Sequence, residues 1–384
     1  MMKKTLRHFR VGALASICLF GMSVGFISCK SSEPKEQVRS LVFKGGDYGS
    51  KFYRIPAIVT AKDGSLVAVA DKRIENNNDL PNPIDIVARR STDGGKTWGE
   101  FITVSEHDSI GGTGDAALVV DQKTGDILAI YSHGNGLWQD SPAQITVNRS
   151  RDNGQTWGDT LNINPQILTT DSLGTQPIKT TSAFATSGRA LQLKDGRIMF
   201  ALVTRQEGEP KFKVYAIYSD DGGHNWQVSK EPATVDGDES KIVELNDGTL
   251  IMSVRNRYRD KLMDNHRIFT YSTDRGETWS EPVAADLIDP ACNGDIITYG
   301  DGQIVLQTLP DSPNKRENVS VFISRDNGKT FPEKQLVYEG PGGYSSITVL
   351  PDGDLGVLTE EGHVEGEGYE IWFTTLDANQ LGLK

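Results

Sequence analysis

The 384-residue sequence predicts an all-β fold, a six-bladed β-propeller of four-stranded antiparallel blades. Three observations predict it. A glycine turn between two apolar runs occurs six times, and a second turn motif with an invariant Asp-x-Gly occurs five times. The segments between these turns lack the spacing of an amphipathic helix, which favours a repeated array of short strands.

The six glycine turns predict one β-hairpin in each blade. Asp-Gly between alternating apolar residues is the strongest local hairpin signal, because glycine supplies the positive φ that the turn requires. The copies read AKDGSLVAV, QKTGDILAI, LKDGRIMFA, LNDGTLIMS, YGDGQIVLQ and LPDGDLGVL. Their glycines are Gly64, Gly125, Gly196, Gly248, Gly302 and Gly353.

The second motif has the pattern Ser-x-Asp-x-Gly-x-Thr-Trp. Its copies are STDGGKTW (91–98), SRDNGQTW (150–157), SDDGGHNW (219–226), STDRGETW (272–279) and SRDNGKTF (324–331). We expect the Asp carboxylate to accept loop amides and the aromatic residue to pack between sheets. Five equivalent copies indicate a scaffold feature and argue against a catalytic role for these aspartates.

The order of the motifs predicts how the array ends. Each of the first five hairpins is followed by one Asp-box turn, whereas the sixth is followed only by the chain end. The last blade therefore lacks a strand, and VRSLVFKG (38–45) is the candidate to complete it. Residues 38–384 are expected to form one domain.

The first residues are typical of an export signal. Basic MMKKTLRHFR precedes the apolar run VGALASICLFGMSVGFIS, and we interpret residues 1–28 as a signal peptide. Cys29 after FIS resembles a lipobox cysteine, and residues 29–37 then form a lipidated cysteine and polar tether. An uncleaved anchor is the alternative. The predicted location is the periplasm or outer-membrane surface of a bacterium, with membrane association only through the lipid.

Charge and cysteine content narrow the possible functions. Without residues 1–28 the chain has 36 Lys and Arg against 52 Asp and Glu, a formal net charge of −16. Such a surface repels nucleic acid, so an anion site has to be a local arginine cluster. Only Cys292 is left once Cys18 and Cys29 are set aside, so no internal disulfide is expected. The histidines lack metal-ligand spacing and no phosphate loop occurs; no metal or cofactor is expected.

The stretch FYRIPAIV (52–59) places Arg54 among strand-forming residues, although arginine almost never enters a core unpaired. Together, YRIP and the Asp-box turns over residues 38–378 resemble the sialidase (exo-α-neuraminidase) family. That resemblance implies three arginines that hold the carboxylate of sialic acid, for which a planar guanidinium is suited. Arg54 matches the first arginine, Arg255 in SVRNRY the second, and Arg316 in NKRENVSV the third.

The resemblance also implies a tyrosine nucleophile, because a carboxylate nucleophile would be repelled by the substrate carboxylate. Tyr344 in GGYSSI matches this tyrosine, and Glu239 in DGDESKIVE matches the glutamate that activates it. Tyr258 and Tyr338 lack a comparable setting.

The general acid should lie on a loop near the leaving group. Asp79, in the polar segment after Arg73, occupies the family's acid position, and the resemblance places Arg73 near the ring O4. Asp85 is the competitor, but IDIVARR reads as a strand, so we interpret its carboxylate as structural.

Two carboxylates are expected to support the site. The resemblance implies that Asp115 contacts the sugar and that Glu360 braces the first arginine. Glu361 is adjacent to Glu360 and remains an alternative, and Thr359 stands where the family has an aromatic residue. Trp138, on a polar loop, either lines an aglycone or acyl pocket or simply packs.

These expectations describe a retaining exo-α-sialidase, a glycoside hydrolase that acts on sialylated glycoproteins, gangliosides and oligosaccharides. Two alternatives remain open. A non-catalytic glycan-binding propeller would lack the acid or the Tyr–Glu pair, and this sequence has candidates for both. A trans-sialidase or intramolecular trans-sialidase would share the fold and differ in water access to the site.

Overall fold

Antiparallel strands make up almost all of the regular structure in the computed structural model, which describes residues 35–136, 138–257, 265–364 and 368–384. Two short helical turns are also present, η1 (Asp47–Gly49) and α1 (Asn164–Ile167). No helix in these ranges is long and apolar enough to cross a membrane. The expected signal peptide (1–28), Cys29 and the tether up to residue 34 lie outside the described residues.

The first three groups of strands follow one another along the chain, and the four main strands of each pair in antiparallel order. The first contains β2 (Phe52–Thr60), β3 (Leu66–Arg73), β4 (Ile84–Ser91) and β5 (Ile102–Ser105). The second contains β6 (Gly112–Val120), β7 (Ile127–Gly134), β8 (Gln144–Ser150) and β9 (Gly158–Asn162), with β11 (Gly188–Arg189) parallel to β6. The third contains β10 (Thr180–Ala185), β13 (Ile198–Gln206), β14 (Lys213–Ser219) and β15 (Gln227–Val228), with β12 (Leu191–Gln192) and β16 (Thr234–Val235) at its margins.

The remaining strands repeat the pattern. One group contains β17 (Gly237–Glu244), β18 (Leu250–Asn256), β19 (His266–Ser272) and β20 (Val283–Ile288). The next contains β21 (Asp295–Tyr299), β22 (Ile304–Pro310), β23 (Glu317–Ser324) and the first part of β24 (Glu333–Val349). The second part of β24 pairs with β25 (Leu355–Val364), which pairs with β26 (Gly368–Leu376) and then β1 (Arg39–Phe43). The first group is also joined to this last one through the pairing of β2 with β26.

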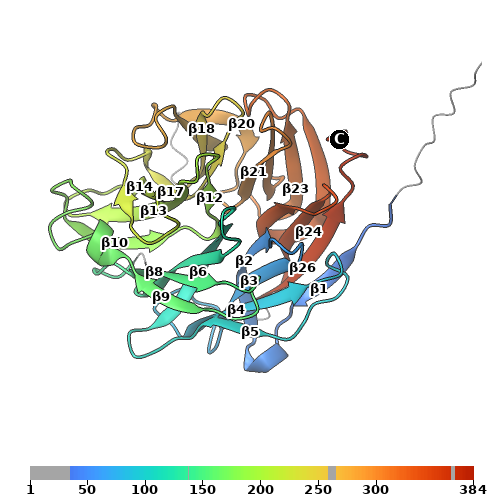
Figure 1. Ribbon diagram of the computed structural model, residues 1–384, viewed down its shortest axis with the longest axis horizontal. Coiled ribbons are helices and arrows are strands. Elements are labelled where there is room, and N and C mark those ends of the chain that lie inside the picture. Colours follow the sequence, from blue (N-terminus) through green and yellow to red (C-terminus); the bar gives the residue numbers. More distant parts are fainter. Residues whose placement is uncertain (1–34, 137, 258–264, 365–367) are drawn as a thin grey trace, which may run out of the picture. The chain divides into compact units, whose positions relative to one another are not determined.

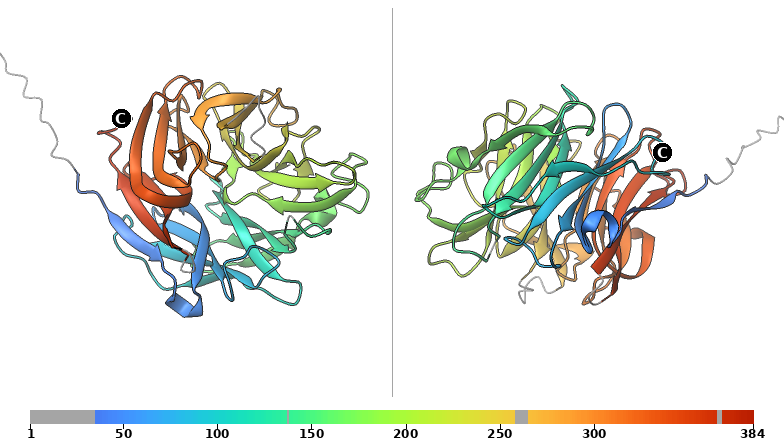
Figure 2. Two further views of the ribbon diagram at one scale, coloured as in Figure 1. Left: turned by 180° about the vertical axis from the view of Figure 1, so that it is seen from behind. Right: turned by 90° about the horizontal axis from the view of Figure 1, so that it is seen from below.

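The pairing of β1 with β26 confirms the expected partner of the 38–45 segment. Arg39 lies opposite Thr374 and Phe43 opposite Ile371, in antiparallel order. Figure 2 shows β1 alongside the C-terminal sheet. The last group of strands thus combines one strand from the start of the described chain with three from its end.

All six predicted hairpins are present. Each glycine turn connects two antiparallel strands; for example, one connects β2 to β3 and another connects β24 to β25. The turn glycines have φ between 83° at Gly353 and 100° at Gly196, a region that other residues rarely adopt.

The Asp-box turns close on themselves as expected. In the first copy, Asp93 Oδ1 accepts hydrogen bonds from the Ser91 hydroxyl (2.7 Å) and the Thr97 amide (3.0 Å), and the Gly95 amide donates to Ser91 Oγ (2.9 Å). The aromatic residue of each copy packs against an apolar cluster between two sheets: Trp98, Trp157, Trp226, Trp279 and Phe331. These aspartates are scaffold residues.

The core is divided among the spaces between neighbouring sheets. Six apolar clusters lie between successive groups of strands, and one of them joins β1, β25 and β26 to β2, β3 and β4. Figure 1 shows the sheets arranged about a common centre, with β2, β6 and β21 near it. Residues from different sheets can therefore meet there.

Candidate active site

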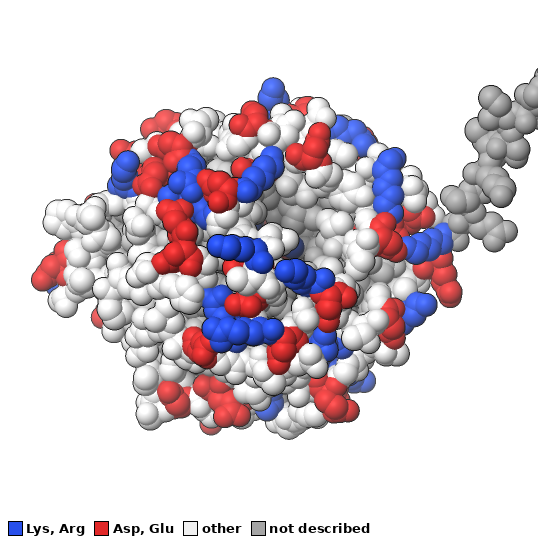
Figure 3. Space-filling view, viewed as in Figure 1, with Lys and Arg blue, Asp and Glu red and all other residues white. Residues whose placement is uncertain are grey.

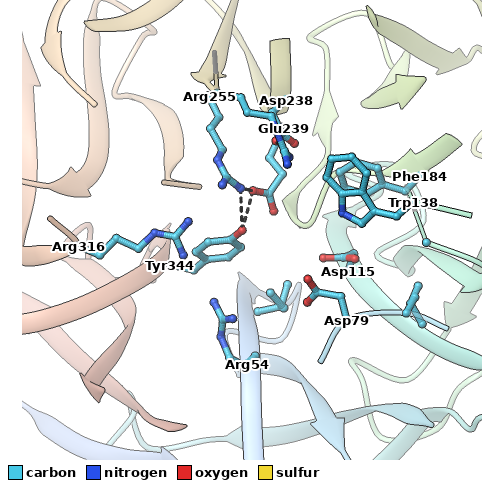
Figure 4. Close-up of a pocket in the computed structure, with 14 residues that line it drawn as sticks. Arg54, Asp79, Asp115, Trp138, Phe184, Asp238, Glu239, Arg255, Arg316 and Tyr344 are labelled. Carbon is cyan, nitrogen blue, oxygen red and sulfur yellow. Dashed lines mark hydrogen bonds and ion pairs between the residues drawn. The ribbon is translucent and has the colours of Figure 1, made fainter. Parts of the chain in front are cut away.

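A pocket of about 240 Å³ lies where the first strands of the sheets converge. Seven of the nine site residues predicted from the sequence line it (Figure 4): Arg54, Asp79, Asp115, Glu239, Arg255, Arg316 and Tyr344. Its other lining residues are Ile55, Leu80, Gly136, Trp138, Phe184, Asp238 and Arg257.

Irregularities in the strand pairing turn four of these side chains into the pocket. A β-bulge bends its strand and re-aims the side chains next to it. Register shifts fall between residues 54 and 57, 114 and 117, 237 and 240, and 342 and 345. Ile55 (φ 60°) and Asp115 (φ 61°) have left-handed backbone conformations at two of these places. Strain of this kind is typical of functional sites, and here it positions Arg54 and Asp115.

Arg54 is held by a fully buried glutamate. Its Nε and terminal nitrogen donate to the two carboxylate oxygens of Glu360 at 2.8 and 3.0 Å. The same oxygens accept the amides of Ile55 (2.9 Å) and Tyr344 (3.0 Å), so one carboxylate joins β2, β24 and β25. Burial acts to raise the pKa of Glu360, but the Arg54 charge and these hydrogen bonds outweigh it and lower the pKa. The alternative, Glu361, points to the opposite face and binds Arg39.

Tyr344, Glu239 and Arg255 form a hydrogen-bonded group in the middle of the pocket (Figure 4). The Tyr344 hydroxyl donates to Glu239 Oε2 at 2.7 Å, and Arg255 donates to the same Glu239 oxygen and to the Tyr344 hydroxyl oxygen at 3.0 Å. Glu239 and Tyr344 are 3% and 8% exposed. Burial and the negative charge of Glu239 raise the pKa of Tyr344 well above its usual value, while the arginines act to lower it.

Arg316 has no carboxylate partner among the described residues. Its only hydrogen bond within them goes to the Ala291 carbonyl oxygen, at 3.1 Å. Its guanidinium lies 5.4 Å from the centre of the Tyr344 ring, and that of Arg54 lies 5.2 Å from the same ring. A partly buried cation without an anion is costly, so the pocket favours an anionic ligand beside Tyr344.

Arg255 supports the same conclusion. Its Nε is buried and has no hydrogen-bond partner among the described residues. A buried donor left without an acceptor is rare in folded proteins. Arg255 and Arg316 therefore have N–H donors that no acceptor among the described residues uses.

Asp79 lies across the pocket from the arginines (Figure 4). Its side chain is 76% exposed and accepts a hydrogen bond from Arg73 at 2.7 Å. Arg73 is itself buried, also donates to the Asn77 carbonyl oxygen (2.6 Å), and lies behind Asp79 outside the pocket lining. Asp79 is thus a solvent-accessible carboxyl group whose position is fixed by the hydrogen bond from the buried Arg73.

A second carboxyl group, Asp71, lies beneath this side of the pocket. Its Oδ1 accepts the Asp115 amide at 3.1 Å, and Arg73 lies 3.6 Å from Oδ2. Burial raises the pKa of Asp71 to about 7, although the Arg73 charge opposes the shift. Burial and then the charges of Asp71 and Glu239 raise the pKa of Asp115 well above its usual value.

One wall of the pocket contains Trp138, which the sequence offered as a possible pocket residue, and three residues that the sequence did not identify: Phe184, Asp238 and Arg257. Trp138 is 62% exposed and stacks on the Arg257 guanidinium (4.8 Å), which forms an ion pair with Asp238 (2.7 Å). Phe184 from β10 completes this wall. Nothing in the local sequence distinguishes Phe184 from other strand residues. Asp238 and Arg257, in contrast, stand close to predicted site residues in the DGDES and RNRY segments, so they could have been found there.

The described residues that the sequence offered as alternatives to Asp79 and Tyr344 do not line the pocket. Asp85 accepts the His107 amide (3.0 Å) and is not part of the pocket lining, and Tyr338 packs near Arg39. Tyr258 falls outside the described residues. No three His, Cys, Asp or Glu side chains within the described ranges are grouped to hold a metal ion.

The positive charge of the pocket is local. On the face drawn in Figure 3, basic and acidic side chains are interspersed around a central hollow. The arginines that line the pocket come from β2, from β18 and its end, and from the residue before β23. The fold therefore gathers cations from separate sheets within an acidic protein.

Comparison with known proteins agrees with this geometry. Residues 57–357 match the BNR repeat-like domain family. A sialidase of Micromonospora viridifaciens is 32% identical over 356 residues, covering 86% of this chain and 53% of that protein. A sialidase of Bacteroides fragilis (strain YCH46) is 30% identical over 352 residues, covering 82% and 61%. The chain thus spans between half and two thirds of these curated relatives.

A solved structure shows the same similarity. The Hadza microbial sialidase Hz136 superposes with a TM-score of 0.76 at 28% identity, covering 88% of this chain and 68% of that chain. The chain therefore belongs to the bacterial sialidase family, and residues 57–357 form its BNR repeat-like domain.

Proposed function

We propose that the protein is a retaining exo-α-sialidase that hydrolyses terminal α-linked sialic acids of glycoproteins, glycolipids and oligosaccharides. The observation that carries the proposal is the placement of three arginines around the Tyr344–Glu239 hydrogen bond, with Arg316 lacking an acidic partner among the described residues. A sugar whose carboxylate sits on the reacting carbon fits this arrangement, because the arginines hold the anion next to the nucleophile.

In the first step, the Tyr344 oxygen attacks the anomeric carbon while the bond to the leaving oxygen breaks. Glu239 takes the phenolic proton, and Asp79 protonates the departing oxygen. A neutral tyrosine suits this step because a carboxylate nucleophile would be repelled by the substrate carboxylate.

In the second step, water attacks the anomeric carbon of the tyrosyl intermediate. Asp79 takes a proton from the water, the bond to Tyr344 breaks, and Glu239 returns the proton to the phenolate. Two displacements at one carbon retain its configuration. The exposed position of Asp79 opposite Tyr344 supports both of its tasks.

We propose a six-bladed propeller as the architecture that holds this site. Apolar clusters between all successive groups of strands, including the last and the first, support it, as does the pairing of β1 with β26. We also propose export as a lipoprotein anchored through Cys29, based on the N-terminal sequence pattern. Replacement of Cys29 by Ala should then move the protein from the membrane fraction to the soluble fraction.

The activity is tested by release of 4-methylumbelliferone from its α-sialoside by the purified protein, between about pH 4 and pH 8. NMR of the first-formed product should show the α-anomer of free sialic acid. A β-anomer would contradict retention, and an anhydro sugar or a transfer product would identify a trans-sialidase. Binding without turnover at every pH would identify a glycan-binding protein instead.

A further inference from the structure

Residues 289–293, between β20 and β21, lie directly behind the arginines and Tyr344. The Ala291 carbonyl oxygen accepts the hydrogen bond from Arg316 at 3.1 Å. The next side chain, Cys292, is fully buried and packs with Tyr344 and Ile55. This segment therefore contacts the third arginine through its backbone and the tyrosine through a side chain.

One end of the segment is fixed by a buried ion pair. Asp289 and Arg267 are both 0% exposed and lie 3.1 Å apart. Asp289 Oδ1 accepts the Cys292 amide (2.9 Å), and Arg267 donates to the Cys292 carbonyl oxygen (2.9 Å). Asp289 Oδ2 also accepts the amide of Asn256, the neighbour of Arg255, at 3.1 Å. The second and third arginines thus share one buried anchor.

The other end is held by a second buried cation. Lys241, 1% exposed, donates to Asn293 Oδ1 at 2.7 Å, and Asn293 donates to the Ser187 hydroxyl at 3.0 Å. Burial lowers the pKa of Lys241 to about 8, although the charge of Glu239 opposes the shift. Because the Lys241 ammonium group is buried, water cannot readily replace Asn293 as its hydrogen-bond acceptor.

The backbone between the two anchors is strained. Ala291 has φ 59°, a left-handed conformation that a non-glycine residue adopts only when its surroundings require it. In this conformation its carbonyl oxygen faces Arg316. The anchors at Asp289 and Asn293 supply the interactions that can maintain the strained residue.

We propose that residues 289–293 are a positioning loop that sets where the Arg316 guanidinium meets the substrate carboxylate, and that Arg267 and Lys241 hold its two ends. The inference rests on the proposed function, since it assigns the carboxylate as the ligand of Arg316. Asn293 acts through Arg316, and Asp289 acts through Arg316 and through the backbone next to Arg255. Neither side chain touches the substrate.

The test compares binding of an unsaturated sialic acid, which keeps the carboxylate on a flattened ring, with binding of its carboxamide. Asp289→Asn should weaken carboxylate binding about tenfold and carboxamide binding much less, because a charge-assisted hydrogen bond is lost only with the carboxylate. Asn293→Ala should act in the same direction. It leaves the Arg267–Asp289 pair intact and so provides the test if Asp289→Asn does not fold.

A double mutant separates positioning from general stability. In an Arg316→Ala background, Asn293→Ala should change the Kd of the carboxylate by less than roughly twofold, because the route from Asn293 to the ligand through Arg316 is already gone. Asp126→Asn is the matched control: Asp126 pairs with the buried Arg149 at 3.0 Å, and neither residue lines the pocket. It should lower the melting temperature and leave the carboxylate-to-carboxamide ratio unchanged.

Equal weakening of both ligands by Asp289→Asn and by Asn293→Ala would overturn the positioning role. Full additivity of Asn293→Ala with Arg316→Ala would overturn it as well. Because the readout is binding, it is independent of turnover. A protein that binds the carboxylate analogue selectively but never releases aglycone would contradict the proposed hydrolysis and leave the loop inference standing.

Discussion

The Tyr344 hydroxyl lies 2.7 Å from Glu239 Oε2, and Arg255 donates to that same oxygen. Burial and the charge of Glu239 raise the pKa of Tyr344 well above its usual value, so the phenol is neutral at physiological pH. A neutral phenol is a weak nucleophile until a base takes its proton. The glutamate is the base within hydrogen-bonding distance.

Replacement of Glu239 by Gln should therefore lower kcat by about 10²–10⁴-fold, the usual contribution of a general base. The amide keeps the size of the side chain but cannot take the proton. Steady-state kinetics with an aryl sialoside measure the effect, and an unchanged melting temperature serves as the control. Activity within a few-fold of wild type would show that another group accepts the proton.

Arg316→Ala should raise KM and lower kcat/KM by at least about tenfold, because each charge-assisted hydrogen bond contributes roughly 1.5–3 kcal/mol. The fold should be preserved, since this side chain makes a single hydrogen bond within the described residues. Arg325→Ala, an exposed arginine paired with Glu333, is a suitable control. Wild-type kinetics for the Arg316 variant would mean that the arginine site is assigned wrongly.

Asp79→Asn should harm substrates with poor leaving groups most. An aryl oxide departs with little protonation, whereas the lactose of sialyllactose requires an acid. We expect kcat/KM to fall much further for sialyllactose than for an aryl sialoside. The same factor on both substrates would argue that Asp79 is not the proton donor.

The buried Asp71 predicts a pH-dependent stability. Its pKa of about 7 exceeds the value near 4 expected for an unfolded chain, so the folded protein binds an extra proton between these limits. The stability that this proton provides is present below about pH 4 and is lost as pH rises through about 7. Asp71→Asn, which does not ionise, should therefore gain stability relative to wild type as pH rises from about 4 to about 7, and the gain should stay constant above that pH.

Urea unfolding of both proteins at several pH values measures this difference. Asp93 in the first Asp box provides a control of opposite sign, because hydrogen bonds from Thr97 and Ser91 outweigh burial and lower its pKa to about 2. Asp93→Asn should be destabilised by a nearly constant amount above about pH 5. A pH-independent difference between Asp71→Asn and wild type would show that Asp71 is ionised throughout.

Local sequence chemistry was sufficient to predict most of the fold. The glycine of each hairpin needs a positive φ, and the Asp boxes form their hydrogen bonds within eight residues, so both can be read without tertiary information. The pairing of β1 with β26 followed from one missing strand. The boundaries of β24, a 17-residue strand shared by two groups, could not be predicted, because the GPGG segment (340–343) where it changes partner is typical of a turn that ends a strand.

The site residues were predicted by resemblance, but their geometry was not. The bulges that turn Arg54 and Tyr344 inward depend on pairing with β3 and β25, which the local sequence does not encode. The choice between Glu360 and Glu361 required the strand register, because neighbouring residues face opposite sides. Phe184 and the 289–293 segment lack a local motif and were missed.

The most direct test of the account is to trap the intermediate. A sialosyl fluoride with a second fluorine at C3 should accumulate a covalent adduct, because the electronegative group slows both steps while the good leaving group favours the first. Peptide mass spectrometry should find the added mass at Tyr344, in GPGGYSSITVLPDG. Glu239→Gln should slow labelling without moving it. A label on Glu239 or Asp79 would contradict the tyrosine mechanism.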